Sequence, residues 1–217
     1  MRTLIIGSSG GIGAALLAAS GASAVGLSRS QHGLDITNEA SIAQHLGALD
    51  GQFDRIIIAT GALELNGAKP EKSLRALDAN AMAAQFALNA MGPILVLKHS
   101  LRLIPKDRPA HIAALSARVG SIGDNGLGGW HSYRAAKAAL NQFFHTAAIE
   151  MARTHPLACA ALIHPGTVAT KLGVGYSGNH ASVPPDQAAQ NILNVLSGLT
   201  PAQSGQFFDW QGKIIPW

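Results

Sequence analysis

Two side chains four residues apart could carry out acid–base chemistry together. Tyr133 and Lys137 fall in the segment SYRAAK, within a stretch of helical character. Residues four apart lie on one face of a helix, with their Cβ atoms about 5–6 Å apart. A free phenol has a pKa of about 10, and a neighbouring ammonium favours the phenolate and lowers that pKa. The spacing therefore predicts a general acid or base at Tyr133, although YxxxK alone more often marks the edge of an amphipathic helix.

A glycine-rich turn near the start of the chain could bind a dinucleotide. Gly7, Gly11 and Gly13 follow an apolar stretch and open an Ala-rich one, and Ser9 and Ile12 lie between them. Glycine permits a positive φ and close approach of the backbone to a pyrophosphate, while a helix N-terminus supplies amide donors. The order of strand, glycines and helix favours a cofactor turn over a glycine-rich connection without function.

The end of the second expected strand bears on which dinucleotide is bound. The residues there are Ser28, Arg29 and Ser30. An acidic side chain would take the ribose 2′-hydroxyl of NAD, whereas an arginine accommodates the 2′-phosphate of NADP. A guanidinium flanked by hydroxyls suits a phosphate. We therefore expect a preference for NADP(H), with NAD(H) as the other candidate, and an exposed surface arginine is the alternative interpretation of Arg29.

Short apolar stretches alternate with Ala-rich helical ones along the chain. This alternation predicts an α/β fold, a single Rossmann-type domain over residues 1–217 with a doubly wound parallel sheet and helices on both faces. The expected strands are 2–6, 23–28, a stub near 33–36, 54–59, 110–116, 158–163 and 205–209. The expected helices are 11–20, 38–48, 71–104 with a break before Pro93, 131–154 and 184–198.

Two glycine-rich segments, 119–131 and 171–183, follow expected strand ends. Ligands of open parallel sheets bind at the carboxyl ends of the strands, so these segments are expected to wall an active site. Trp130, Leu172 and Tyr176 are candidate apolar contacts for a substrate. Packing within the loops is an equally good interpretation of these three residues.

Several motifs in the correct order resemble the short-chain dehydrogenase/reductase family, over nearly the whole chain. The nearest resemblance is to its branch of C-factor-like signalling proteins and sniffer-type carbonyl reductases. The matching positions are Gly7, Gly11 and Gly13 (glycine motif), Asp35 and Ile36 (adenine contact), Ala59, Thr60 and Gly61 (the Asn-Ala-Gly position), Asn89 (the tetrad Asn, in ALNAMG), Tyr133 and Lys137 (YxxxK), and 164–170 (HPGTVAT, the PG-motif loop).

The resemblance implies a role for each of these positions. Tyr133 would be the proton donor, Lys137 would hold the nicotinamide ribose, and Asn89 would hold a water in the proton relay. The loop with Pro165, Gly166, Val168 and Thr170 would fix the nicotinamide carboxamide. The implied activity is NADP(H)-dependent hydride transfer between nicotinamide and the carbonyl or alcohol carbon of a small-molecule substrate.

The catalytic serine of the family has no direct counterpart in this sequence. It commonly lies three residues before a glycine, and counting back from Gly120 gives Ala117. Ser116 is adjacent, but neighbouring strand residues face opposite sides, so its hydroxyl reaches a substrate only if the strand end twists or bulges. We expect Ser116 to supply the hydroxyl, with Ser121 as the second candidate.

Two further departures concern the cofactor. Only five residues separate Arg29 from Asp35, too few for a helix of typical length, so we expect a more open adenine pocket. Ala59 stands where the family has Asn, which should tune cofactor binding while Gly61 still permits close backbone approach.

Composition limits the partners. Hydrophobic residues make up 47% of the 217 residues and charged residues 13%, which favours a homo-oligomer. By family resemblance this would be a homodimer or homotetramer through 71–104 and 131–154. The net charge of +4 comes without a basic run, which argues against nucleic acid.

Cysteine, histidine and the N-terminus bear on location and metals. Cys159 is the single cysteine and lies in an apolar stretch, which predicts a buried strand residue and no disulfide. The N-terminal apolar stretch is too short for a signal peptide or membrane span, so we expect a cytoplasmic protein without a membrane partner. The histidines lack metal-ligand spacing, and no metal is expected.

Two other functions are alternatives to oxidoreductase activity. A nucleotide-binding signalling protein with little turnover is suggested by Ala117 and by the C-factor-like stretch, but Asn89, Tyr133 and Lys137 argue against it. A methyltransferase would share the fold, yet it needs neither YxxxK nor HPGTVAT.

Overall fold

Six apolar stretches form one parallel sheet. The computed structural model describes residues 1–170, 176 and 181–217. The strand order is β2-β1-β3-β4-β5-β6, and each neighbouring pair is parallel. The strands are β1 (Thr3–Ile6), β2 (Val25–Leu27), β3 (Arg55–Ile58), β4 (Ala110–Leu115), β5 (Ala158–Ile163) and β6 (Phe207–Phe208).

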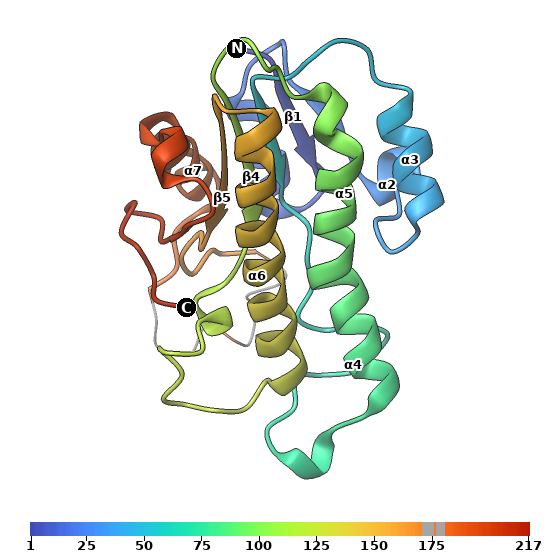
Figure 1. Cartoon of the computed structure of the whole chain (residues 1–217). Helices are drawn as coiled ribbons and strands as arrows, with labels where there is room; N and C mark the ends of the chain where they lie inside the picture. Colours follow the sequence, from blue (N-terminus) through green and yellow to red (C-terminus); the bar gives the residue numbers. More distant parts are fainter. Residues whose placement is uncertain (171–175, 177–180) are drawn as a thin grey trace.

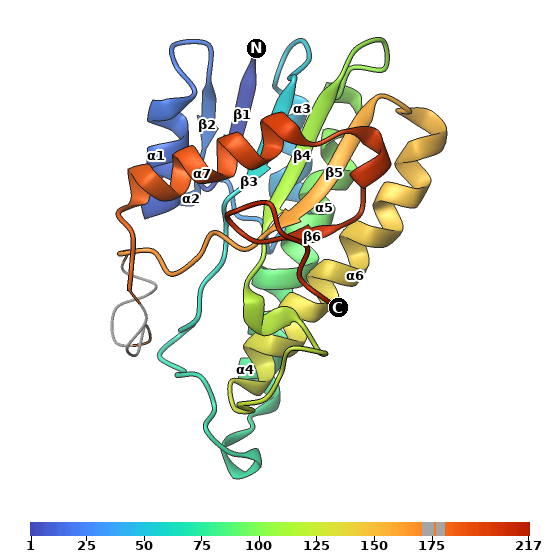
Figure 2. The ribbon, with the colours of Figure 1, turned by 90° about the vertical axis from the view of Figure 1, so that its left-hand side faces the viewer.

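The helices cover both faces of this sheet, as the sequence predicts (Figures 1 and 2). Side chains of α3, α5 and α6 pack into the core on one face, and those of α1 and α7 into the core on the other. The helices are α1 (Gly11–Ala19), α2 (Arg29–His32), α3 (Glu39–Gly47), α4 (Ala79–Phe86), α5 (Gly92–Ser100), α6 (His131–Thr154) and α7 (Pro185–Gly198).

Strand β5 shows why the strands read as continuous apolar runs. All six of its residues are buried. Leu162 belongs to the core under α6, whereas Ile163 belongs to the core under α7. A central parallel strand buries both faces, so its sequence shows no polar alternation. Cys159 lies in this strand, is buried, and forms no disulfide, as expected.

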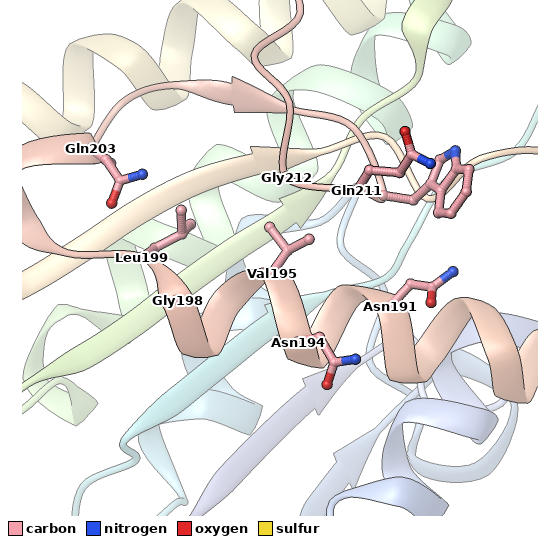
Figure 3. A pocket seen from close by; sticks show the side chains of 9 residues that line it. Asn191, Asn194, Val195, Gly198, Leu199, Gln203, Gln211 and Gly212 are labelled. Carbon is pink, nitrogen blue, oxygen red and sulfur yellow. The ribbon is translucent and has the colours of Figure 1, made fainter.

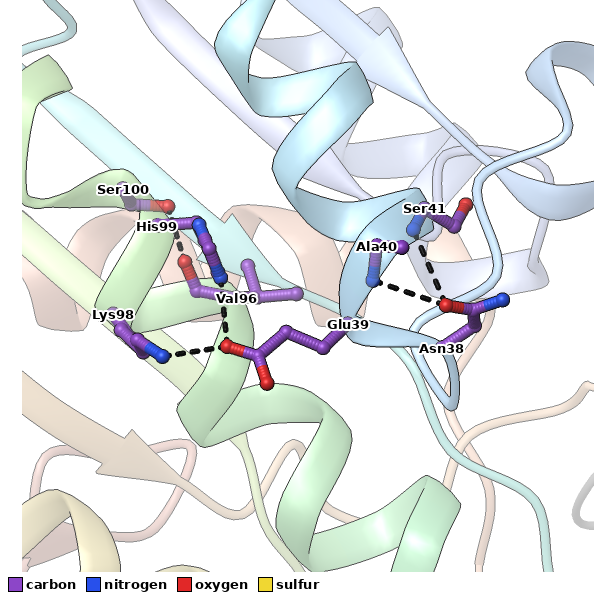
Figure 4. A network of polar contacts seen from close by, with 8 residues as sticks. All are labelled: Asn38, Glu39, Ala40, Ser41, Val96, Lys98, His99 and Ser100. Atoms are coloured by element: carbon purple, nitrogen blue, oxygen red, sulfur yellow. Dashed lines mark hydrogen bonds and ion pairs between the residues drawn. The ribbon is translucent and has the colours of Figure 1, made fainter.

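Helix α3 is fixed locally and then tied to α5 (Figure 4). The Asn38 side chain accepts hydrogen bonds from the amides of Ala40 and Ser41, a cap that contributes about 1 kcal/mol. Glu39 contacts Lys98 at 2.6 Å and His99 at 3.0 Å, both on α5. These contacts are exposed to solvent, so they orient the two helices more than they stabilise them.

The expected helix over 71–104 is wrong in two respects. Residues 71–78 hold only a 3₁₀ turn, and α4 begins at Ala79, where Asp78 caps the first turn by accepting from the amide of Ala81 at 2.8 Å. The helix does not break before Pro93. A π-helical segment, Ala87–Met91, joins α4 to α5, and its wider turn accommodates a residue that has no N–H to donate.

The strand stub near 33–36 is also wrong. The chain forms the single turn of α2 and then reverses at Gly33, which has a φ of 77°. The short α2 agrees with the expectation that no helix of typical length fits before Asp35. The other elements begin and end within two residues of the expected bounds, and β5 and α6 have the expected bounds at both ends.

One helical run among the described residues, Ala79–Leu103, is long and apolar enough to cross a membrane by length and composition alone. Here it lies against α3 and α6, and several of its apolar side chains belong to the core. This packing against other helices accounts for the apolar character of the run.

Candidate active site

A cavity of about 750 Å³ lies at the carboxyl edge of the sheet. Tyr133 lines it, as do Trp130 and Tyr176, whose rings meet edge to face at 5.6 Å. The walls include parts of both expected loops, although Leu172 and most of 171–180 lie outside the described residues. The further lining residues are Ile12, Leu63, Ser116, Ala117, Arg118, Val119, Asp124, Leu127, Gly128, Arg134, His164, Pro165, Gly166, Thr167, Val168 and Thr170.

A second hollow, of about 470 Å³, lies between α7 and the turn at 209–212 (Figure 3). Its polar lining is made of amides such as Asn191, Asn194 and Gln211, which do not exchange protons near neutral pH. The cavity at Tyr133 is therefore the candidate active site.

Tyr133 and Lys137 share one face of α6, as their spacing predicts. Both side chains are buried, and Lys137 Nζ lies 5.8 Å from the centre of the Tyr133 ring. Nζ also donates a hydrogen bond to the carbonyl oxygen of Leu115 at the end of β4, at 2.9 Å. The pair on α6 is thus held against the carboxyl edge of the sheet.

The pKa of Tyr133 shifts in the direction opposite to the one expected from the sequence. Burial raises the pKa of Tyr133 because the phenolate would lose its hydration. Burial also lowers the pKa of Lys137 to about 7, so part of its amine is neutral at neutral pH and attracts the phenolate less. The structure therefore holds Tyr133 as a neutral phenol, the form that can donate a proton.

Asn89 lies in the π-helical segment and is fully buried. Its amide nitrogen donates to the carbonyl oxygen of Ala62 at 2.9 Å and to Gln85 Oε1 at 2.6 Å, while its oxygen accepts from the amide of Ala62 at 3.1 Å. Asn89 thus fixes the loop after β3. Both side-chain N–H groups are occupied, so the side chain could bond to a relay water only through the remaining lone pair of Oδ1.

The glycine turn lies where the strand order reverses, between β1 and β3. Gly7 has a φ of +91°, and a Cβ there would lie 2.8 Å from the carbonyl oxygen of Ala59. A Cβ on Gly11 would lie 2.6 Å from Thr170 Cγ2, and one on Gly13 would lie 2.1 Å from the Gly7 oxygen. Three distant segments therefore meet at the crevice where open α/β sheets bind ligands.

The residues at this crevice fit a dinucleotide. The hydroxyl oxygens of Ser8 and Thr60 are buried, and neither has a hydrogen-bond partner in the described part of the chain. Ser9 is exposed at the turn, and Ile12 lines the cavity. Buried polar groups without partners in a native fold point to a missing ligand or water. Amides at the start of α1 are placed to meet an anion.

Comparison with known proteins identifies the family. A family model described as short chain dehydrogenase matches residues 30–179, more than half of the chain. The 1-hydroxy-2-glutathionyl-2-methyl-3-butene dehydrogenase of Rhodococcus sp. (strain AD45) is 30% identical over 195 residues, covering 85% of this chain and 79% of that protein. The chain belongs to the short-chain dehydrogenase/reductase family. It is therefore an oxidoreductase enzyme, and the methyltransferase alternative is wrong.

Other members place this short-chain dehydrogenase/reductase in the expected branch. The C-signal protein of Myxococcus xanthus is 35% identical over 136 residues, covering 63% of this chain and 78% of that protein. The carbonyl reductase Sniffer of D. melanogaster has the same fold, with a TM-score of 0.84 at 21% identity over 100% of this chain and 99% of that one. A Burkholderia multivorans family member with bound NADP has a TM-score of 0.81 at 26% identity, with 100% and 99% covered.

In this dehydrogenase/reductase, the hydroxyls of both candidate serines, Ser116 and Ser121, donate to other protein groups. Ser116 Oγ donates to Asn141 Oδ1 of α6 at 2.7 Å, so the hydroxyl is bound within the protein. Ser121 Oγ donates to the carbonyl oxygen of Pro216 at 2.5 Å, and Ser121 is not among the residues that line the cavity. Ala117 lines the cavity and carries no hydroxyl.

At the adenine end of the expected cofactor site, polar side chains already form hydrogen bonds with residues close to them in the sequence. Asp35 accepts hydrogen bonds from the Thr37 hydroxyl and amide, which hold its pKa below the ordinary value, and Arg29 adds a smaller effect. The hydroxyl of Ser28 contacts Gln31. Arg29 is exposed, and no hydrogen bond joins its guanidinium to any residue that the structure describes.

The sequence analysis missed Glu71. Its carboxylate accepts hydrogen bonds from both the amide and the hydroxyl of Ser132, and its carbonyl oxygen accepts from the amide of Trp130. Trp130, the residue before α6, supplies no side-chain cap of its own. The only sequence signal was this missing cap, which does not reveal the partner.

Within residues 1–170, 176 and 181–217, no group of three His, Cys, Asp or Glu side chains is placed to hold a metal ion.

Proposed function

We propose that this enzyme transfers hydride between NADP(H) and the carbonyl or alcohol carbon of a small molecule, with Tyr133 as the general acid and base. The observation that carries the proposal is the buried, neutral phenol of Tyr133 in a cavity beside the glycine turn. A neutral phenol favours the direction of carbonyl reduction, because that direction consumes a proton.

The chain's own residues perform the remaining steps. When bound, the nicotinamide supplies or accepts the hydride at the substrate carbon. Tyr133 donates its proton to the substrate oxygen during reduction and removes it during oxidation. Lys137 would hold the nicotinamide ribose, and Asn89 keeps the loop after β3 in place. Trp130, Tyr176 and Leu127 make the entrance apolar, which excludes water from the reacting atoms.

The binding roles of the cofactor site follow the geometry around the glycine turn. We assign the pyrophosphate to the start of α1, the adenine to Asp35 and Ile36, and the 2′-phosphate to Ser28 and Arg29. The carboxamide would lie against the PG-motif loop. The preference for NADP(H) is supported by the exposed guanidinium and by the NADP bound to the Burkholderia multivorans protein. The full proposed set is Gly7, Ser9, Gly11, Ile12, Gly13, Ser28, Arg29, Asp35, Ile36, Ala59, Thr60, Gly61, Tyr133, Lys137, Pro165, Gly166, Val168 and Thr170.

The substrate class is a small carbonyl compound or alcohol. The Rhodococcus relative is named for a hydroxylated glutathione conjugate, which is consistent with an alcohol carbon as the reacting centre. The similarity to C-signal keeps a signalling role in view. Tyr133, Lys137 and Asn89 are all buried, Lys137 lies near the Tyr133 ring, and Lys137 and Asn89 both lie beside Gly61, which favours turnover instead.

We further propose one domain over residues 1–217, a cytoplasmic location and a homo-oligomer. The homo-oligomer is supported by exposed apolar side chains on neighbouring helices. They are Met82, Phe86 and Met91 along the helical run 79–103, and Phe143 and Ile149 on α6. Apolar side chains gathered on one helical surface are typical of subunit interfaces.

The test is NADPH oxidation by the purified protein with a panel of aldehydes, ketones and quinones, in parallel with Tyr133→Phe. We expect the wild type to turn over at least one class, and the variant to lose about 100-fold or more in kcat while it binds NADPH as before. Equal activity of the variant would refute the assignment. NADPH binding without any turnover by the wild type would favour the signalling alternative.

A further inference from the structure

The end of β4 offers no free hydroxyl to a substrate. Ser116 lies on the face of the sheet toward α6, where its hydroxyl is bound by Asn141, and Ala117 has no polar group. With Tyr133 alone, the substrate carbonyl oxygen would have a single hydrogen-bond donor during reduction. Active sites that protonate a carbonyl oxygen gain speed from a second, preorganised donor.

The neighbouring strand places a different donor at this position. His164 follows β5, directly beside Ser116, whose amide donates to the carbonyl oxygen of Ile163 at 2.8 Å. Side chains alternate along a strand, and Leu162 packs under α6, so His164 also faces α6. It lines the same cavity as Tyr133. The imidazole is therefore on the correct face and at the correct edge of the sheet.

The two nitrogens of His164 have different surroundings. Nδ1 is fully buried and has no hydrogen-bond partner among the residues that the structure describes, whereas Nε2 is not among the buried atoms without a partner. Because no described residue hydrogen-bonds to this side chain, Nε2 is the nitrogen accessible from the cavity. A buried N–H without an acceptor is costly, so the proton belongs on Nε2 and only a lone pair is buried at Nδ1.

The imidazole is also uncharged. Burial lowers the pKa of His164 to about 4, nearby Arg118 lowers it further, and Asp209 opposes both. A neutral imidazole can donate a hydrogen bond from Nε2 without giving up its proton. Tyr133 then remains the group that supplies the proton.

We propose that His164 Nε2–H donates a hydrogen bond to the substrate carbonyl oxygen, the task expected of the missing serine. The inference rests on the proposed function. Hydride adds to the carbonyl carbon, the proton of Tyr133 goes to the oxygen, and His164 keeps its proton throughout. The hydrogen bond strengthens as negative charge develops on the oxygen, which lowers the barrier.

Four variants test the proposal with NADPH and the best carbonyl substrate of the panel. His164→Gln keeps an N–H donor near the Nε2 position, His164→Asn places its amide near Nδ1, and His164→Ala removes both. His111→Gln is the matched control, because His111 lies at the start of β4, at the opposite edge of the sheet from the cavity. We expect the Ala and Asn variants to lose about 100-fold in kcat/KM, with Gln recovering about 10-fold over Ala. The kcat/KM of His111→Gln and the NADPH affinity of all four variants should each change by less than about 3-fold.

The outcomes separate the inference from the proposed function. Loss of activity in Tyr133→Phe with full activity in His164→Ala overturns the inference alone, as does equal rescue by Asn and Gln. Retained activity in Tyr133→Phe refutes the proposed function itself. A readout without substrate is ¹⁵N NMR of the histidines, with the His164→Gln spectrum as the reference. A neutral ring with the proton on Nε2 between pH 6 and 8 is expected, and a charged ring or a proton on Nδ1 overturns the proposal.

Discussion

The phenol of Tyr133 and the amine of Lys137 are both shifted by burial toward their uncharged forms. This reverses the usual argument in which a charged lysine makes its tyrosine more acidic. Removal from water penalises phenolate and ammonium alike, and a neutral pair avoids both penalties. The site is thus set to give a proton away, and the reverse reaction needs conditions that favour the phenolate.

The depressed pKa of Lys137 has a consequence for stability. Burial lowers the pKa of the native amine to about 7, whereas an ordinary lysine has a pKa of 10.5, so the unfolded chain binds more protons between these pH values. Stability relative to Lys137→Met should therefore rise from pH 7 to pH 9.5, by at most about 1.4 kcal/mol per pH unit. Urea unfolding of both proteins across this range measures the difference. A difference that does not vary with pH would mean that native Lys137 keeps an ordinary pKa.

Arg29 is an exposed cation just after the end of β2. Arg29→Ala should raise the dissociation constant for NADPH about 10-fold or more, since a hydrogen bond to a charged group contributes about 1.5–3 kcal/mol. The constant for NADH should hardly change. Fluorescence titration with both cofactors gives the comparison, with Arg75→Ala as an exposed control. Equal weakening for NADH and NADPH would remove Arg29 from the 2′-phosphate site.

At the scale of elements, the start of α6 decides where Tyr133 lies. This helix begins after Trp130 in a left-handed conformation and depends on Glu71, from the loop between β3 and α4, for its cap. Burial raises the pKa of Glu71, but the hydrogen bonds from Ser132 and from the Glu71 amide, with a smaller effect of His131, together lower it by more, so the carboxylate is ionised at neutral pH. A negative charge also suits a helix N-terminus.

Loss of this cap should affect both stability and turnover. Glu71→Ala removes the acceptor of two hydrogen bonds, and we expect a loss of about 1–2 kcal/mol in the free energy of unfolding. We also expect a lower kcat, because Tyr133 directly follows the capped residue. Lys72→Ala, an exposed neighbour, is the control in urea unfolding and in the NADPH assay. A Glu71→Ala variant as stable as Lys72→Ala would contradict the capping role.

At the scale of the whole molecule, the β1 and β3 ends form the proposed cofactor crevice, while β4, β5 and α6 form the proposed reacting end. Both open on the carboxyl edge of one sheet, the lower edge in Figure 1. The run 79–103 and α6 carry exposed apolar side chains, and we propose that Met82, Phe86 and Met91 of the run form an interface with Phe143 and Ile149 of α6.

That surface gives a prediction about assembly. Phe86→Glu places a charge among exposed apolar side chains, and burying an unpaired charge in an interface is costly. We expect the wild type to be a dimer or tetramer by analytical ultracentrifugation and this variant to dissociate. Ile122→Glu, in an exposed loop away from these helices, should leave the assembly intact. A monomeric wild type at micromolar concentration would remove the proposed interface.

The sequence by itself determined the features that depend on neighbours along the chain. Strand and helix order, the glycine turn and the shared helix face of Tyr133 and Lys137 follow from periodicity and spacing, which act over a few residues. The family followed as well, because its motifs are short segments in a fixed order.

Only the tertiary structure decided the contacts between distant segments. It bound the Ser116 hydroxyl to Asn141, used Glu71 to cap α6 where a helix was expected, and buried the phenol so that its pKa rose. Burial and long-range hydrogen bonds depend on which elements pack together, and no local pattern encodes them. For the same reason, the exposed nitrogen of His164 became visible only in the folded chain.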